Sequence, residues 1–322
     1  MLWYLDNWQS MSTDTPERMQ VGPFGRPFGA ILRNPLNSGQ PRGLNENYGR
    51  EVMELHTLGV GGGYTQQDVI EVARCFTGWT VHSPEDPRFE FVPFMHDDGE
   101  KTVLGHKIAP GGGEKDGLEV IEILSRHPST AHFISKQLAQ RFVADDPPAA
   151  LVNRMAATFL KTDGDLRAVM QTMFASPEFF SEGAWQAKVK SPFELVVSAI
   201  RAIGATSFDP VVVSQKIADL GEPLFGKVEP NGYPLTGDAW LGTSDLLGRM
   251  NFAAALVSGK FPGLKLDMNQ WNGRDPQAIA RELMGRPLSP TTLAALGDGL
   301  QGTGTPPVTA GLILGSPEFN RR

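Results

Sequence analysis

Residues 191–203 read SPFELVVSAIRAI, and this stretch decides the fold class of the chain. Its first four residues form a capping box that begins at Ser191 and ends at Glu194. Pro192 stands at the first helical position, where its missing N–H has no partner to lose. Apolar residues then recur three and four positions apart and share one helix face: Leu195, Val196, Ala199, Ile200 and Ile203. The stretch therefore predicts a helix near 192–204 with one buried face.

Helix starts of the same kind recur along the chain. The pattern recurs at six of the Ser-Pro and Asp-Pro pairs of the chain, those that begin at Ser176, Ser191, Asp209, Asp275, Ser289 and Ser316. Helical periodicity follows most of these starts. We predict helices near 45–58, 65–78, 115–126, 129–143, 148–161, 165–175, 192–204, 210–220, 244–258, 276–285, 290–297 and 307–315. Alternation in RFEFVPF (88–94), with the short KTVLG (101–105), predicts one small β-hairpin near 88–105.

These elements predict a mainly α protein: a multi-helix globular domain with a small inserted β-hairpin. We expect an irregular N-terminal segment at 1–43 and a main helical domain at 44–220. Residues 221–322 are expected to be a C-terminal helical section packed on the same core. Two helices end alike, in ASPEFFS (175–181) and GSPEFNRR (315–322). We interpret this as one helix-ending chemistry used twice.

The composition argues against several classes of protein. A net charge of −7, with no run of Lys or Arg, argues against a nucleic-acid surface. No apolar run is long enough for a transmembrane segment, and MLWYLDNWQS at the start lacks the features of a signal peptide. Cys75 is the only cysteine, which excludes an intrachain disulfide and thiol–metal clusters. GVGGGYT (59–65) follows a predicted helix and lacks a phosphate-loop lysine, so it is interpreted as a helix end and a link.

Polar residues on the first predicted helix allow two interpretations. Glu46, Arg50 and Glu54 are spaced i, i+4, i+8, which is typical of a solvent-side ion-pair ladder. Alternatively, Glu51 and Glu54 face a cleft as metal ligands or as an acid–base pair. His56 falls at the edge of the apolar stripe of this helix and is expected to be a core histidine.

A second polar group lies in FMHDDGEKTVLGHK (94–107). His96, Asp97 and Asp98 supply an imidazole and carboxylates, followed by Lys101. These residue types suit a transition-metal site. The same HDDG residues also suit a tight turn, because Asp and Gly supply the local bonds and positive φ that turns require. From the residues alone both interpretations stand.

Several of these stretches together resemble a known family. They are LNENYGREVMELHTLGVGGGYTQQDVIEVARCFTGWTV, HDDGEKTVLG, DDPP, LRAVMQTMFASPEFF, KVKSPFELVVSAIRAIG, LGEPLF, Arg249-Met250-Asn251 and ILGSPEFNRR. In this order, over essentially the whole chain, they are similar to the bacterial domain-of-unknown-function family 1800. The resemblance implies a predominantly helical bacterial protein and transfers no activity.

The resemblance also carries expectations about context. Relatives often bear export signals, which implies the periplasm or cell envelope for full-length relatives. They are often encoded beside a sulfatase-like partner. Relatives extend upstream of the position of Met1, so the resemblance implies that this chain is truncated and matches the C-terminal larger part of the family.

The residues that match the family's motifs favour one polar cluster. Its members are Asn45, Glu46, Asn47, Arg50, Glu51, Glu54, His96, Asp97 and Lys101. We expect it to bind a polar ligand or a divalent metal ion, the one candidate cofactor. Its metal ligands would be Glu51, Glu54, His96 and Asp97, with Arg50 and Lys101 holding an anionic substrate.

Two other functions are left open. One is a non-catalytic helical scaffold that docks the sulfatase-like partner, with the same polar residues as buried structural networks. The other is a sugar-binding module that uses Trp240 and Trp271. Whether the chain is an enzyme stays open at this stage.

Overall fold

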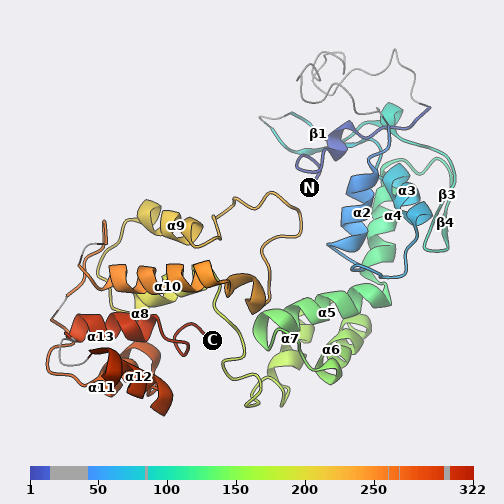
Figure 1. Ribbon diagram of the computed structural model, residues 1–322. Helices are drawn as coiled ribbons and strands as arrows, with labels where there is room; N and C mark the ends of the chain where they lie inside the picture. The colour runs from blue at the N-terminus through green and yellow to red at the C-terminus, as the bar shows by residue number, and fades with distance from the viewer. Residues whose placement is uncertain (15–42, 84–85, 260, 268, 301–304) are drawn as a thin grey trace. The chain divides into compact units, whose positions relative to one another are not determined.

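The computed structural model describes residues 1–14, 43–83, 86–259, 261–267, 269–300 and 305–322. Its helices confirm the mainly α prediction (Figure 1). They are α2 (Glu46–Glu54), α3 (Gln66–Cys75), α4 (Glu114–Ser125), α5 (Pro128–Phe142), α6 (Ala149–Lys161), α7 (Leu166–Phe174), α8 (Pro192–Ala202), α9 (Pro210–Asp219), α10 (Thr243–Leu256), α11 (Pro276–Met284), α12 (Pro290–Leu300) and α13 (Pro306–Leu314). Short 3₁₀ turns are η1 (Asn7–Gln9), η3 (Pro93–Met95) and η4 (Gly237–Trp240). Each predicted helix is present, although α2 and α3 end earlier than predicted.

The prediction of a single hairpin near 88–105 is wrong in its pairing. Strand β1 (Trp79–Val81) pairs with β2 (Phe89–Phe91), and β3 (Lys101–Val103) pairs with β4 (His106–Ile108), both antiparallel. The two predicted strand segments therefore belong to different two-stranded sheets. Leu104 and Gly105 both have positive φ, 50° and 80°, which suits the tight two-residue turn between β3 and β4. The HDDG residues precede β3 and do not form that turn.

The described chain divides into two compact units. Unit 1 comprises Met1–Lys136 and Val152–Thr172, and unit 2 comprises Gln137–Leu151 and Met173–Arg322. The division runs through α5, α6 and α7, and does not coincide with the expected boundaries at 44 and 221. Of the expected irregular segment 1–43, residues 15–42 lie outside the described part.

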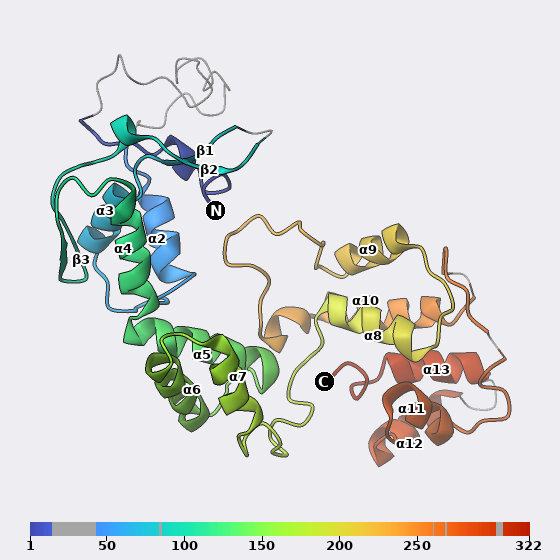
Figure 2. The same ribbon diagram turned by 180° about the vertical axis from the view of Figure 1, so that it is seen from behind.

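Unit 1 is built around α3. This helix contacts α2, α4 and β3, and both views show α2, α3 and α4 side by side (Figures 1 and 2). The buried face of α3 includes Val69, Val72 and Phe76. The predicted capping box from Thr65 to Asp68 opens the helix. The polar face of α3 contacts the loop that leads to β3.

Unit 2 is built around α8, α10, α11 and α13. Helix α13 contacts α10 and α11, and α8 contacts α9 and α11. Trp271 is fully buried in this core and Trp240 is buried as well, so the aromatic surface expected for sugars is not exposed at either position. The capping box at Ser191 is present as predicted, with Glu194 bonded back to the Ser191 N–H.

The end of the chain is tied to the segment before α8. The backbones of Lys188 and Arg322 exchange two hydrogen bonds, and Lys190 N–H donates to the Asn320 carbonyl. Buried Arg249 of α10 donates to the Asn320 side chain and to the Lys190 carbonyl, at 3.1 and 2.9 Å. These bonds set the position of both Lys190 and Arg322.

The repeated Ser-Pro-Glu-Phe motif has the same local geometry in both places. The Ser176 hydroxyl accepts from the Phe179 N–H, and the Ser316 hydroxyl accepts from the Phe319 N–H, each at 3.3 Å. Both copies of the motif therefore end a helix in the same way, and the choice between a shared helix-ending chemistry and an internal duplication stays a prediction. None of the described helices is both long and apolar enough to serve as a membrane span.

Candidate functional site

The expected residues of α2 have partners close by. Asn45 caps the helix, because its Oδ1 accepts from the Tyr48 N–H at 3.0 Å while its Nδ2 donates to the Leu5 carbonyl. Gln66 of α3 lies between Glu46 and Arg50: its amide donates to Glu46 and its oxygen accepts from Arg50. Asn45 is therefore a structural cap, and the charged residues connect α2 to α3.

The remaining residues of α2 do not converge on a cleft. Glu54 accepts from the Tyr64 hydroxyl at 2.9 Å. Glu51 forms no side-chain hydrogen bond or ion pair with another described residue, and Asn47 is exposed. The expectation that His56 lies in the core is wrong, because α2 ends at Glu54 and the apolar stripe ends with it.

His96 belongs to a separate, buried network. Its Nδ1 lies 2.8 Å from the Thr77 carbonyl, and its Nε2 lies 3.2 Å from Asp116 Oδ2. Both ring nitrogens therefore face oxygen acceptors, and the ring edge meets Phe91 at 5.5 Å between centroids. No ring nitrogen is left to bind a ligand.

Lys101 and Asp116 form the charged centre of this network. Lys101 Nζ lies 2.6 Å from Asp116 Oδ2, and the side chains are 0% and 2% exposed. The same ammonium donates to the Gly99 carbonyl at 3.0 Å and to the Asp97 carbonyl. All three of its hydrogens thus have acceptors, as a buried ammonium requires. We refer to His96, Lys101 and Asp116 as the buried triad.

Asp97 faces α3 instead. The Arg74 guanidinium donates two parallel hydrogen bonds to the Asp97 carboxylate, from Nε to Oδ2 at 2.9 Å and from Nη2 to Oδ1 at 3.0 Å. Arg74 also pairs with Glu71 at 2.6 Å. Burial raises the pKa of Asp97, but the bonds from Arg74 and the Gly99 N–H outweigh it, so the pKa lies below its ordinary value.

The expected cluster therefore separates into two groups. No hydrogen bond or ion pair joins the α2 residues to the His96–Asp97–Lys101 group in the part of the chain that is described. Within that same part, no group of three or more His, Cys, Asp or Glu residues is arranged to hold a metal ion. The expected metal ligands Glu51, Glu54, His96 and Asp97 do not come together, because His96 and Asp97 are already occupied by protein groups.

Cys75 lies beside the buried triad but is not a nucleophile. It is fully buried, and this burial raises the pKa of its thiol to about 12. A thiol with such a pKa stays protonated at neutral pH, and the thiolate is the reactive form.

The ion pair of Asp97 supports a prediction about pH. Because its folded pKa is lowered, Asp97 stabilises the fold above its ordinary pKa and loses this effect as pH falls through the lower value. We expect Asp97→Asn to lower the free energy of unfolding by about 1.5–3 kcal/mol at pH 7, and by less at pH 3. Urea denaturation at both pH values measures this difference. Asp98→Asn, at the exposed neighbour, is the matched control and should change neither value; equal losses at both pH values would contradict the assignment.

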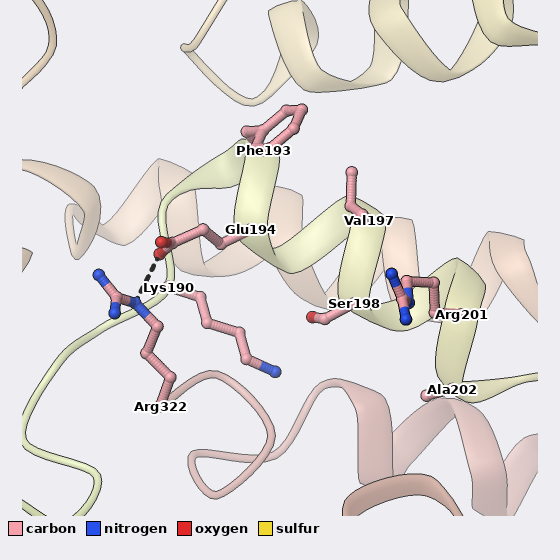
Figure 3. A pocket seen from close by; sticks show the side chains of 8 residues that line it. All are labelled: Lys190, Phe193, Glu194, Val197, Ser198, Arg201, Ala202 and Arg322. Carbon is pink, nitrogen blue, oxygen red and sulfur yellow. Dashed lines mark hydrogen bonds and ion pairs between the residues drawn. The ribbon is translucent and has the colours of Figure 1, made fainter. Parts of the chain in front are cut away.

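A cavity of about 500 Å³ in unit 2 presents a different arrangement (Figure 3). Its lining residues are Lys190, Phe193, Glu194, Val197, Ser198, Arg201, Ala202 and Arg322, and we call it the Lys190 pocket. Helix α8 supplies one wall, and the ends of the segments 188–190 and 320–322 supply another. Three of the lining side chains are cationic, and Glu194 carries the one carboxylate side chain among the described lining residues.

Glu194 is already neutralised by arginine. Its Oε2 lies 3.0 Å from Arg322 Nε, and its Oε1 lies 2.7 Å from Arg141 Nη2. Lys190 turns away from that pair in Figure 3, and its Nζ rests 3.8 Å from the centre of the Phe319 ring. Neither Lys190 nor Arg201 has a side-chain hydrogen bond or ion pair with another described residue. The pocket thus holds an excess of positive side-chain charge.

The positive surroundings act on Lys190. Burial first, and then the charges of Arg286 and Arg322, lower the pKa of Lys190 to about 8, against an opposing effect of Glu194. A negative ligand beside the Lys190 ammonium would therefore offset the positive charges that lower its pKa.

One known protein family matches nearly the whole chain. The model of a family described as protein of unknown function (DUF1800) matches residues 1–321. The chain belongs to this family. No curated protein and no solved structure shows significant similarity to it.

The DUF1800 match covers the chain from its first residue. The expectation that this chain corresponds only to the C-terminal larger part of the family has no support in that match. The match likewise gives no support to a metal or to a sulfatase-like partner. The absence of a nucleic-acid partner and the envelope location stay predictions.

Stretches that carry the resemblance to DUF1800 meet at the Lys190 pocket. KVKSPFE contributes Lys190 and Glu194 to the lining, and SPEFNRR contributes Arg322. Phe319, in the second stretch, does not line the pocket, but its ring lies under the Lys190 ammonium. Sequence reasoning missed this site because it interpreted both stretches as helix caps only. The available signal was a lysine or arginine next to each cap, which periodicity does not explain.

Proposed function

We propose that this DUF1800 chain binds a small anionic ligand, a molecule bearing a carboxylate, sulfate or phosphate group, in the Lys190 pocket. The observation that carries the proposal is the unbalanced positive charge around a cavity of about 500 Å³. The ligand class is the polar, anionic one expected from the sequence. Its site lies on α8 and not on α2.

The three cations of the pocket can act differently on an oxyanion. Arg322 is held by Glu194 through Nε, and one of its terminal nitrogens donates to the Arg141 carbonyl. Arg201, in the last turn of α8, is exposed and has no side-chain partner among the described residues. Arginine offers a planar fork that matches two oxygens of an oxyanion, whereas Lys190 offers a point charge. We therefore assign Arg201 to bidentate binding and Lys190 to charge neutralisation.

The apolar parts of the pocket indicate a ligand with a carbon skeleton. Phe193, Val197 and Ala202 line the same cavity. Small-molecule sites typically combine an apolar lining with a few placed polar groups. An organic acid or organic phosphate fits this combination better than a bare inorganic ion.

Sulfate is the simplest probe of the proposal. Titration calorimetry at low ionic strength should detect binding, and Lys190→Met or Arg201→Met should each weaken it about tenfold, because a charge-assisted bond contributes about 1.5–3 kcal/mol. Lys216→Met on α9 is the matched control, because that lysine is exposed and paired with Asp219. Equal weakening by the control variant, or no binding to the unchanged protein, would refute the proposal.

The same titration has an expected pH dependence. Sulfate keeps its charge between pH 6 and 10, whereas Lys190 loses its proton as pH rises through about 8. Affinity should therefore be constant below that pH and fall above it, with proton uptake on binding near pH 8. Comparison in buffers of different ionisation enthalpy measures the uptake, and Lys190→Arg should abolish it.

A second candidate, docking of a partner protein, is favoured by a row of aromatic rings in unit 2. Phe174, Phe179 and Phe180 stack edge to face at 5.0 Å between successive centroids. Phe180 and the nearby Trp185 are 78% and 72% exposed. Exposed aromatic residues are enriched at protein interfaces.

The docking candidate has its own test. Co-expression with the sulfatase-like partner should give co-purification that the double variant Phe180→Ser/Trp185→Ser abolishes. The melting temperature should stay unchanged, because neither side chain is in the core. Full co-purification of the double variant would remove this surface from consideration.

A further inference from the structure

Lys190 differs from its neighbour Lys188 in what holds its nitrogen. Lys188 Nζ is buried against the Asp145 carboxylate and the Leu235 carbonyl. Lys190 Nζ instead lies over the Phe319 ring, at the wall of the pocket, with no hydrogen-bond acceptor among the described residues. Of the two lysines, Lys190 is thus the one that lines the cavity and whose nitrogen has no protein acceptor among the described residues.

Such a nitrogen can present its lone pair to a ligand after losing a proton. We propose that Lys190 forms an imine with small oxo acids, molecules that carry an aldehyde or ketone beside a carboxylate. This inference rests on the proposed function, because a neighbouring arginine would hold the carboxylate while the carbonyl carbon meets Lys190. Arg201 and Arg322 line the same cavity and supply that charge.

The chemistry needs no further reactant. The neutral Lys190 amine adds to the carbonyl carbon, forming a C–N bond while the carbonyl oxygen takes a proton. Loss of that oxygen as water leaves a C=N bond to Lys190. The overall exchange is amine plus carbonyl to imine plus one water, with no change in oxidation state.

The charges and burial around Lys190 also favour the neutral amine that this reaction needs. Burial, Arg286 and Arg322 together lower the pKa of Lys190 to about 8, with Glu194 opposing. At pH 7.5 the neutral fraction of such an amine is on the order of 100-fold larger than that of an ordinary lysine. Lower basicity reduces the reactivity of each neutral amine, so we expect a net rate advantage of at least about tenfold.

Reductive trapping with glyoxylate tests the inference. The whole chain is treated with glyoxylate and cyanoborohydride at pH 7.5, which converts an imine into a stable carboxymethyl amine, and modified lysines are located by peptide mass spectrometry. Lys190 should be labelled at least about tenfold faster than Lys216 or Lys227, both surface lysines paired with carboxylates. The rate should saturate with glyoxylate and fall on addition of sulfate.

Two comparisons separate this inference from the proposed function. Lys190→Arg has no amine that can form an imine, so it should lose the selective label, and sulfate binding by the unchanged protein measures the proposed function separately. Acetaldehyde, which lacks the carboxylate, should label Lys190 more slowly than glyoxylate and without competition by sulfate. Uniform labelling of surface lysines would overturn the imine inference, even where sulfate binding is retained. If Lys190 is labelled equally fast by both aldehydes and sulfate has no effect, the assignment of oxo acids as the ligand class would be overturned. If calorimetry also detects no sulfate binding, the proposed function would be refuted as well.

Discussion

Asp116→Asn is expected to destabilise unit 1 by about 3–5 kcal/mol, because it leaves the Lys101 ammonium buried without its counter-ion. Asp116 Oδ2 lies 2.6 Å from Lys101 Nζ and 3.2 Å from His96 Nε2, and all three residues are buried. Water cannot replace the lost charge at that depth. Hydrogen exchange, followed separately on peptides from α4 and α8, should show protection lost in unit 1 first.

Two variants check the origin of this loss. Asp163→Asn breaks the pair between Asp163 and Arg126, which is also in unit 1 but exposed, and should leave the exchange unchanged. Adding Lys101→Met to Asp116→Asn removes the orphaned ammonium and should restore part of the stability. A double variant as unstable as the sum of both single variants would show that the two charges are not coupled.

Trp271→Ala is expected to cost unit 2 about 3–5 kcal/mol, the usual loss for removing a fully buried aromatic side chain. Trp271 is 0% exposed and lies in the core formed by α8, α10, α11 and α13. Its indole N–H has no hydrogen-bond partner among the described residues. The cost should therefore come from lost packing and from the cavity left behind.

The nature of the replacement tests that reason. Trp271→Phe keeps most of the ring and removes the unpaired N–H, so it should cost much less than Trp271→Ala. Trp185→Ala removes an exposed indole from the same unit and should be neutral. Urea denaturation measures all three. A loss for Trp271→Phe as large as that for Trp271→Ala would mean that packing is not the cause.

Local signals predicted the helices of this protein well. Ser191 and Thr65 cap α8 and α3 as their spacing predicts, because a cap and its N–H partner lie within three residues of each other. Proline at the first helical position acts over the same short range. The wrong prediction for His56 also came from a local signal, because the helical periodicity was extended past Glu54, where α2 ends.

The candidate sites depended on longer-range contacts. His96, Asp97 and Lys101 were singled out from the sequence, yet their partner Asp116 lies on α4 and was not. Asp116 packs so tightly on the loop before α4 that a Cβ on Gly112 would lie 1.9 Å from its Oδ1. Such a contact depends on how the loop folds over the helix start, which no spacing rule encodes.

The amino-acid sequence by itself determined the mainly α class and the helix starts at capping residues and prolines, since each depends on neighbours within about one helical turn. Tertiary structure alone decided that the α2 carboxylates lie apart from His96. It also decided that the two predicted strands pair with β1 and β4 and not with each other. It also brought Lys190 to Phe319 and Arg322 to Glu194, pairs that are more than a hundred positions apart in the chain. Burial and charge pairing act between surfaces in space, so they are settled only when the helices pack.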